Sequence, residues 1–209
     1  MEGIGAVILA AGQAKRFGSM KQLSYLGEKP LFLYPVELAL SMEFSCITLV
    51  GNKHTESMKD YIQDYNISYI KNEESENGMS SSLKKGISAL PSDIQAVFLF
   101  LGDQPFIPKE VVIKMYSIYQ DHYENGIRIV RALYEGQAGH PVLFDRELFP
   151  LLINIEGDQG ARDIIRLFSS KVETVDFPKR MWNMDIDTQS DYEQAIRVLA
   201  NNTKSKIDY

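Results

Sequence analysis

The stretch Ala6-Val-Ile-Leu-Ala-Ala-Gly-Gln-Ala-Lys-Arg-Phe-Gly-Ser-Met-Lys21 decides the fold of this chain. Its first four residues predict a buried strand, which runs into a loop of small residues that includes Gly12 and Gly18. Small residues let backbone N–H groups approach phosphate oxygens without a Cβ in the way, and cations nearby neutralise the remaining charge. Arg16 and Lys21 supply two such cations. The stretch therefore predicts a strand followed by a loop that binds a polyphosphate.

The spacing of this loop differs from the two common phosphate-binding patterns. A P-loop requires a lysine directly after its second glycine, whereas Lys21 comes three residues after Gly18. The G-x-G-x-x-G pattern of dinucleotide-binding folds is also absent from the loop. A buried strand followed by a solvated, glycine-containing turn is therefore the structural alternative that these residues leave open.

Apolar runs recur along the chain with helical patterns between them, which is typical of βαβ units and a largely parallel sheet. Strands are predicted at Ala6 to Leu9, Cys46 to Val50, Ile67 to Ile70, Ala96 to Leu101 and Ile127 to Leu133. Helices are predicted at Leu31 to Met42, Thr55 to Tyr65, Ser80 to Leu90 and Lys109 to His122. Such sheets bind ligands beyond the carboxyl ends of their strands, so we expect the loops after the first and fourth strands to share one cleft.

The pattern loosens beyond residue 133, where we expect a flap on the substrate side. Its predicted elements are a strand at Pro141 to Phe144, helices at Arg146 to Ile153 and Gly160 to Ser169, and a strand at Val172 to Val175. A terminal helix is predicted at Gln189 to Ala200. We therefore predict a single domain over residues 1–200 and a polar C-terminal tail over residues 201–209.

Composition excludes several classes of protein. The chain has 209 residues, 44% of them hydrophobic and 24% charged, with no apolar run near the ~18 residues of a membrane span. Its net charge of −6 argues against a nucleic-acid groove, which needs a basic patch. No basic region precedes the first apolar run, so that run is expected to be a strand rather than a signal sequence. A cytoplasmic protein fits these features, and its single cysteine, Cys46, cannot form an internal disulfide.

Two acidic segments are candidates for a metal site. Asp103 directly follows the most apolar of the predicted strands, in the turn Gly102-Asp103-Gln104-Pro105. Asp185 and Asp187 precede the terminal helix. Carboxylates suit Mg²⁺, which binds through one or two of them together with substrate phosphates. The structural alternatives are a turn role for Asp103 and an N-cap role for Asp187 or Thr188.

Two further segments carry polar groups that have both a structural and a functional interpretation. Gly78 and three serines, including Ser82, open a predicted helix, either as an ordinary serine cap or as a second wall of a nucleotide pocket. His140 lies in the turn Gly139-His140-Pro141, where a lone histidine before proline is more often structural than functional.

The first loop resembles the signature L-A-[AG]-G-x-x-x-R-[FM]-G-x-x-K of the MobA-like nucleotidyltransferases, which include molybdenum cofactor guanylyl- and cytidylyltransferases. The matching residues are Leu9, Ala10, Ala11, Gly12, Arg16, Phe17, Gly18 and Lys21. The resemblance implies a three-layer, Rossmann-like nucleotide-diphospho-sugar transferase fold. It also implies transfer of a nucleoside monophosphate from a triphosphate to a phosphate-bearing acceptor, with release of pyrophosphate.

The resemblance also assigns roles to residues of this chain. The nucleotide-binding residues it implies are Leu9, Ala10, Ala11, Gly12, Arg16, Lys21, Gly78, Ser82 and Asp103. Among these, Arg16, Lys21 and Asp103 would be catalytic: Arg16 would stabilise the leaving pyrophosphate, and Lys21 would reach the α-phosphate. Mg²⁺ would bind Asp103 and Asp187, since Asp187 matches the second acidic position of an [ND]-x-[ND]-T-P-E-D segment. Gln189 departs from the proline of that segment, which affects local rigidity more than metal binding.

The acceptor-binding residues implied by the resemblance are Gly139, His140 and Pro141. The segment Gly157-Asp158-Gln-Gly160-Ala161-Arg162 resembles a further acceptor contact. These features resemble the cytidylyltransferase branch, so CTP and molybdopterin are the expected substrates. The resemblance also implies a transient complex with a molybdenum hydroxylase. A purine-catabolism accessory protein that matures xanthine dehydrogenase is similar. The alternatives are a sugar- or polyol-phosphate nucleotidyltransferase and a non-catalytic molybdenum cofactor carrier.

Overall fold

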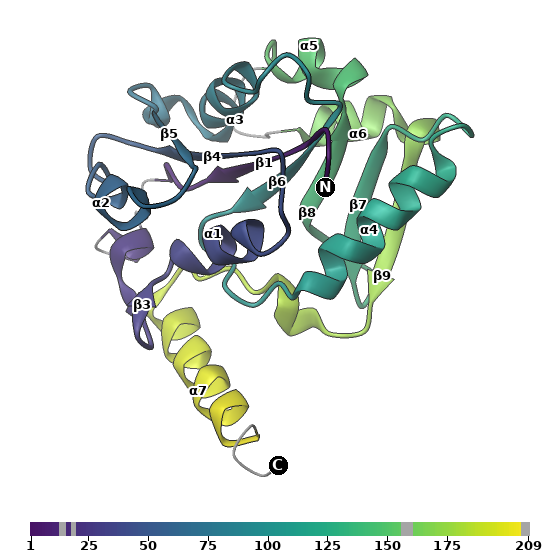
Figure 1. The fold of residues 1–209 in the computed structure, drawn as a ribbon. Coiled ribbons are helices and arrows are strands. Elements are labelled where there is room, and N and C mark those ends of the chain that lie inside the picture. Colours follow the sequence, from purple (N-terminus) through teal and green to yellow (C-terminus); the bar gives the residue numbers. More distant parts are fainter. Residues whose placement is uncertain (13–15, 18–19, 156–160, 206–209) are drawn as a thin grey trace.

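A seven-stranded sheet forms the middle layer of the molecule in the computed structural model, which describes residues 1–12, 16–17, 20–155 and 161–205 (Figure 1). Its strands are β1 (Ile4–Leu9), β4 (Cys46–Gly51), β5 (Ser68–Lys71), β6 (Ala96–Leu101), β7 (Ile129–Tyr134), β8 (Gln137–Asp145) and β9 (Val172–Phe177). The spatial order is β5-β4-β1-β6-β8-β7-β9. β8 runs antiparallel to β6 and β7, whereas β1–β4, β4–β5, β1–β6 and β7–β9 pair in parallel. The predicted, mostly parallel α/β sheet is confirmed.

Helices cover both faces of the sheet, because alternate residues of its strands are apolar on each side. On β6, Phe98 and Phe100 belong to one buried cluster and Leu99 to the other. The first cluster packs against α1 (Leu33–Leu40), α2 (Met58–Ile62) and α4 (Lys109–His122). The second packs against α3 (Met79–Ser88), α5 (Phe149–Leu152) and α6 (Arg162–Leu167). The molecule therefore has the three layers predicted for this fold.

A small second sheet and the last helix lie at one side of this core (Figure 1). β2 (Tyr25–Leu26) and β3 (Lys29–Pro30) form an antiparallel pair, and α7 (Gln189–Ser205) packs against β2. Leu26, Leu31, Ile186 and Ala195 are buried in the cluster between them. Short 3₁₀ turns occur at Lys21–Leu23, Ser75–Asn77, Arg146–Leu148, Ser169–Lys171 and Arg180–Asn183.

The prediction of a flap beyond residue 133 is wrong. The segment Pro141 to Phe144 lies within β8, a nine-residue strand between β6 and β7 near the middle of the sheet. Leu143 is buried against one helical layer, and Val142 and Phe144 are buried against the other. β9 also belongs to this sheet, paired with β7. An antiparallel strand joined by a tight turn to its neighbour can enter a parallel sheet without a crossover helix.

Other differences concern element ends. The helix predicted at Thr55 to Tyr65 is confined to Met58–Ile62, and that at Arg146 to Ile153 begins with a 3₁₀ turn. The terminal helix continues to Ser205, five residues beyond the predicted Ala200, and residues 206–209 lie outside the described part. α6 begins at Arg162, while Gly160, its predicted start, is not among the described residues. In the described ranges, no helix is long and apolar enough to cross a bilayer.

Candidate functional site

Three segments that are distant in sequence meet at the carboxyl edge of the parallel strands. The ammonium of Lys21, from the loop after β1, lies 2.7 Å from Asp103 Oδ2, which follows β6. The same Lys21 Nζ lies 2.6 Å from Asp187 Oδ1, which precedes α7. Arg16 Nη2 lies 2.6 Å from the other carboxylate oxygen of Asp187. The structure thus brings together the predicted catalytic and metal-binding residues, although their chemical roles remain predictions.

Lys21 is unusually enclosed for a lysine, with a side chain that is only 5% exposed. Burial by itself would lower the pKa of Lys21, but Asp103 and Asp187 together raise it above its ordinary value. The lysine is therefore held in its charged form between two carboxylates. An ammonium in this position can neutralise a phosphate or occupy the place of another cation.

The backbone of the first loop is fixed by buried polar side chains. Asn52 Nδ2, just after β4, donates to Ala11 O at 2.8 Å, and Gln22 Nε2 donates to Gly12 O at 3.1 Å. A Cβ added to Gly12 would meet Gln22 Nε2 at 3.6 Å, which is ordinary contact. No described protein atom therefore requires glycine at position 12, as expected where an external group approaches the backbone. Gly18, which completes the predicted motif, lies outside the described residues.

The turn after β6 lies directly against this loop. A Cβ on Gly102 would come within 2.7 Å of Ala10 Cβ, so glycine is needed for the close approach. Asp103 Oδ2 bonds to Lys21, whereas Asp103 Oδ1 is buried and has no hydrogen-bond partner among the described residues. Leaving a buried acceptor without a partner costs about 1–3 kcal/mol. The carboxylate of Asp103 therefore has one oxygen available for a ligand that the protein does not supply.

The N-cap alternative for the acidic segment is resolved in favour of Thr188. Thr188 Oγ1 accepts from Asp191 N at 3.2 Å, while Asp191 Oδ2 accepts from Thr188 N at 2.7 Å. These reciprocal bonds form a capping box at the start of α7. The carboxylate of Asp187 takes no part in the cap and instead binds Arg16 and Lys21.

Asp185 also faces the site, which the sequence reasoning did not favour. Asp185 Oδ1 accepts from Gln104 Nε2 at 2.9 Å. Although its carboxyl opens onto the cavity, enclosure by protein raises the pKa of Asp185 to about 6, with Asp103 and Asp187 adding to the shift. In the described ranges, no three His, Cys, Asp or Glu side chains are grouped as a metal-ion cage. A cation here would therefore take part of its coordination from a ligand.

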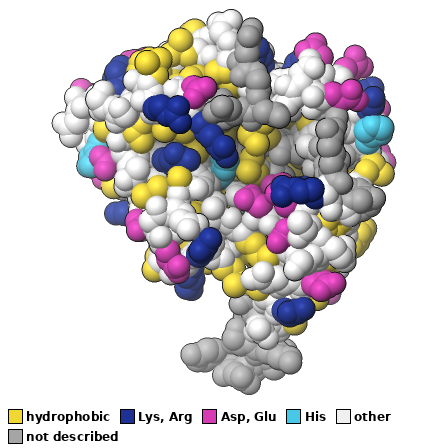
Figure 2. All heavy atoms as spheres, turned by 180° about the vertical axis from the view of Figure 1, so that it is seen from behind, with side chains coloured by type: hydrophobic (Ala, Val, Ile, Leu, Met, Phe, Trp, Pro, Cys, Tyr) yellow, Lys and Arg dark blue, Asp and Glu magenta, His cyan; other side chains and the backbone are white. Residues whose placement is uncertain are grey.

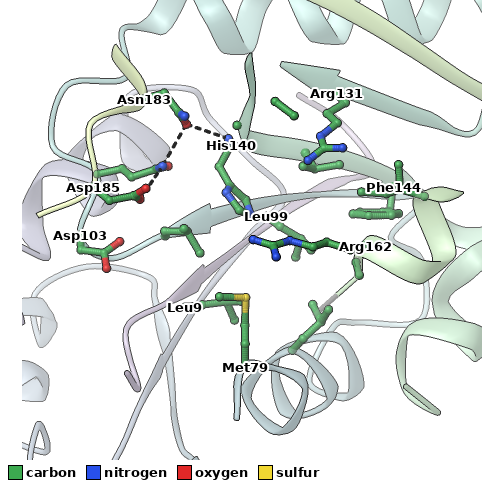
Figure 3. A pocket seen from close by; sticks show the side chains of 18 of the residues that line it. Leu9, Met79, Leu99, Asp103, Arg131, His140, Phe144, Arg162, Asn183 and Asp185 are labelled. Carbon is green, nitrogen blue, oxygen red and sulfur yellow. Dashed lines mark hydrogen bonds between the residues drawn. The ribbon is translucent and has the colours of Figure 1, made fainter. Parts of the chain in front are cut away.

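A cavity of about 320 Å³ extends from these carboxylates across the carboxyl edge of the sheet (Figure 3). Figure 2 shows this face hollowed, with acidic and basic side chains around an apolar floor. The nucleotide residue predicted at Leu9 and the acceptor residues predicted at Gly139 and His140 line the cavity, whereas Pro141 does not. Its volume is within the range of small-molecule sites, so it can hold a ligand between the two predicted half-sites.

The wall of the cavity that carries the predicted acceptor residues is built around Asn183. Asn183 Oδ1 accepts from His140 N at 3.2 Å and from Gln104 Nε2 at 3.1 Å (Figure 3). A Cβ on Gly139 would overlap the Asn183 amide, so only glycine fits there. Tyr134 OH donates to His140 O at 2.6 Å, and the His140–Pro141 peptide bond is cis. Burial, together with the nearby Arg131 and Arg162, lowers the pKa of His140 to about 4, so its imidazole is neutral at pH 7.

The serine-cap alternative for α3 is wrong. The N-cap residue is Gly78, whose φ of 90° favours glycine, and no side chain caps the helix. The hydroxyl oxygens of Ser81 and Ser82 instead accept hydrogen bonds from Asn72 Nδ2, at 2.8 and 2.9 Å. Met79 and Leu83 of α3 line the cavity, while a nucleotide contact by Gly78 or Ser82 remains a prediction.

Several polar residues in or beside the site were not predicted from the sequence. They are Asn52, Asn72, Gln104, Arg131 and Asn183. Two of them had a signal: Asn52 and Asn72 each directly follow a strand of the parallel sheet, where its carboxyl end meets the ligand edge. The segment Gly157-Asp158-Gln-Gly160, predicted to contact the acceptor, lies outside the described residues.

A model of the MobA-like NTP transferase domain matches residues 6–175, which include β1, its loop and the Asp103 turn. The chain belongs to this family. It is therefore a nucleotidyltransferase, and the resemblance inferred from the first loop is confirmed.

Two curated relatives match over nearly the whole chain. The molybdenum cofactor cytidylyltransferase of Escherichia coli strain K12 is 24% identical over 195 residues, covering 92% of this chain and 95% of the relative. The molybdenum cofactor guanylyltransferase of Histophilus somni strain 2336 is 27% identical over 211 residues, covering 94% and 98%. The chain is similar to enzymes that use different nucleotides, so these matches leave the base preference open.

The fold is shared with solved structures. The protein Rv0371C of Mycobacterium tuberculosis H37Rv, in a complex with manganese, superposes with a TM-score of 0.70. The two chains are 21% identical, and the match covers 93% of this chain and 97% of the other. At this identity the superposition establishes the common fold.

Proposed function

We propose that this MobA-like protein transfers CMP from CTP to molybdopterin and releases pyrophosphate. The acceptor phosphate oxygen forms a bond to the α-phosphorus of CTP, and the bond from that phosphorus to its bridging oxygen breaks. Because the acceptor phosphate is already ionised at pH 7, the reaction needs no general base. Positioning and charge neutralisation supply most of the acceleration in such transfers.

The observation that carries the proposal is the arrangement of Lys21 between Asp103 and Asp187, with Asp103 Oδ1 left open. Two carboxylates with one free, buried oxygen fit Mg²⁺, which usually keeps only one or two protein carboxylates and completes its shell with phosphates and water. Asp103 and Asp187 would hold the ion, which would neutralise charge on the phosphates.

The remaining groups bind and orient the substrates. The open backbone at Gly12 would cradle the β- and γ-phosphates, held in place by Asn52 and Gln22. Arg16, at the mouth of the site, would stabilise the leaving pyrophosphate, and Lys21 would turn from the carboxylates to the α-phosphate. The acceptor would lie along Gly139 and His140 in the same cavity.

The choice of substrates rests on the cytidylyltransferase among the relatives and on the turn Gly139-His140-Pro141. In this proposal the product is delivered in the cytoplasm, through a transient complex, to a molybdenum hydroxylase such as xanthine dehydrogenase.

The test is pyrophosphate release by the purified protein with Mg²⁺, molybdopterin and, in separate reactions, CTP, GTP, ATP or UTP. Release with CTP and its loss on chelation of Mg²⁺ are the expected results. Release with GTP alone would overturn the base assignment, and release with none of the four would overturn molybdopterin as the acceptor.

A matched pair of variants tests the metal assignment in the same assay. Asp103→Asn keeps the shape of the side chain but removes its charge. We expect the rate of pyrophosphate release to fall at least about a hundredfold. Asp64→Asn removes the same charge from an exposed loop residue outside the cavity and should keep the wild-type rate. Equal rates for the two variants would refute the role of Asp103.

A further inference from the structure

Arg131 is a charged residue in an otherwise apolar strand. It is the charged residue of the apolar sequence Ile129-Val-Arg-Ala-Leu-Tyr134, which forms β7. Arg131 pairs in register with Val142 of β8, and a register irregularity follows it between residues 131 and 133. Irregularities of this kind are frequent beside functional sites, where they redirect a side chain. The side chain of Arg131 enters the cavity at the end remote from Asp103 (Figure 3).

The guanidinium of Arg131 is half-buried and has no acidic partner within the described ranges. Its Nε atom is buried with no hydrogen-bond partner, and Arg131 forms no salt bridge within the described ranges. Desolvation without compensation is costly for a charged group. A ligand that supplies the missing negative charge would remove part of this cost.

A second arginine faces the same space. Arg162, at the start of α6, lines the cavity and also has no acidic partner in the part of the chain that the structure describes. Burial, followed by the charge of Arg162, lowers the pKa of Arg131. His140, which lies between these arginines and the carboxylates in Figure 3, is neutral and adds no charge of its own. This end of the cavity therefore carries unpaired positive charge, whereas the carboxylates at the Asp103 end are paired with Lys21 and Arg16.

We propose that Arg131 and Arg162 form a subsite for a tetrahedral oxyanion of the acceptor. The assignment to the acceptor rests on the proposed function, because the triphosphate then lies at the opposite end with the carboxylates. Two guanidinium groups can each donate two parallel hydrogen bonds to an oxyanion, a geometry that lysine cannot reproduce. The acceptor class is a molecule with a second anionic group besides its reacting phosphate, either a phosphate ester or an oxometallate.

Direct binding of small oxyanions tests the subsite without any knowledge of the acceptor. The intact protein is titrated in a calorimeter with inorganic phosphate and, separately, with molybdate, in low salt and without nucleotide. The same titrations are made with Arg131→Met, which keeps length and apolar volume, and with Arg162→Gln. Arg166→Gln is the matched control, since it removes an exposed arginine four residues along the same chain segment and outside the cavity.

We expect Arg131→Met and Arg162→Gln each to weaken oxyanion binding by about tenfold or more, and Arg166→Gln to leave it unchanged. Tighter binding of molybdate than of phosphate would assign an oxometallate end to the acceptor, and the reverse a phosphate ester. Arg131→Met should fold normally, because it removes an unpaired, half-buried charge. If that variant fails to fold, the titration of Arg162→Gln, which changes an exposed residue, tests the subsite by itself.

Equal binding by all four proteins would show that the oxyanion lies elsewhere, for example in the loop after β1, and would overturn the subsite. Absence of binding to the wild type would overturn it as well. Titration with CTP and Mg²⁺ separates this result from the proposed function: nucleotide binding that survives in Arg131→Met leaves the transferase assignment standing. Absence of CTP binding by the wild type would instead refute the proposed use of CTP alone.

Discussion

Replacing Lys21 by methionine should destabilise the protein, because it removes the ammonium that lies between Asp103 and Asp187. Removing one partner of a fully buried ion pair costs about 3–5 kcal/mol. Here Lys21 is 5% exposed, but Asp103 is 21% exposed and Asp187 is 39% exposed. Arg16 also remains bonded to Asp187. Solvent and Arg16 therefore reduce the expected loss to about 2 kcal/mol of unfolding free energy.

The assay is urea denaturation at pH 7 in the presence of a chelator, with wild type, Lys21→Met, Asp103→Asn and the double variant. Because the two groups interact directly, the double variant should be more stable than the sum of the single losses predicts. When a divalent cation is added in place of the chelator, it should stabilise Lys21→Met more than it stabilises the wild type, since it would replace the missing charge. Additive losses within about 0.5 kcal/mol would refute the reasoning, as would unchanged stability of Lys21→Met.

Four other substitutions test separate contacts. Asn52→Ala removes the anchor of the first loop, so we expect a loss of about 1–3 kcal/mol in urea denaturation and a higher KM for the nucleotide; a changed stability with an unchanged KM would contradict this. Gly139→Ala forces a Cβ into Asn183 and should lower the free energy of unfolding by about 1–3 kcal/mol. Gly12→Ala should instead leave the free energy of unfolding unchanged and weaken nucleotide binding. His140 has a folded pKa of about 4, below its unfolded value, so its contribution to stability is present above about pH 6.5 and is lost as the pH falls. Linkage gives a loss of about 1–2 kcal/mol between pH 7 and pH 5, which His140→Gln should not show; parallel curves for the two proteins would disprove the shift.

The sequence was informative where local pattern and burial agree. The strand Ala96–Leu101 and the helix Lys109–His122 have the predicted bounds, since an unbroken apolar run ends at Gly102 and a helical pattern begins after Pro108. The meeting of Lys21 with Asp103 also followed from the sequence, because the carboxyl ends of parallel strands lie at one edge.

The sequence was less informative beyond residue 133. β8 has apolar residues on both faces, but nothing local shows that it enters the sheet between β6 and β7 in the antiparallel direction. The sequence did not single out Arg131 for the same reason. Whether an arginine in a strand has a partner is known only when the side chains around it are known.

The sequence by itself determined the α/β class, the loop predicted to bind phosphate and the acidic groups at the carboxyl edge of the sheet, because these depend on periodicity and on residue chemistry over short spans. Only the tertiary structure decided the position of β8, the pairing of Lys21 with both carboxylates and the separation of an acidic end from an arginine end of one cavity. Those features depend on which distant segments share the same space, and that choice is made by packing of the whole core.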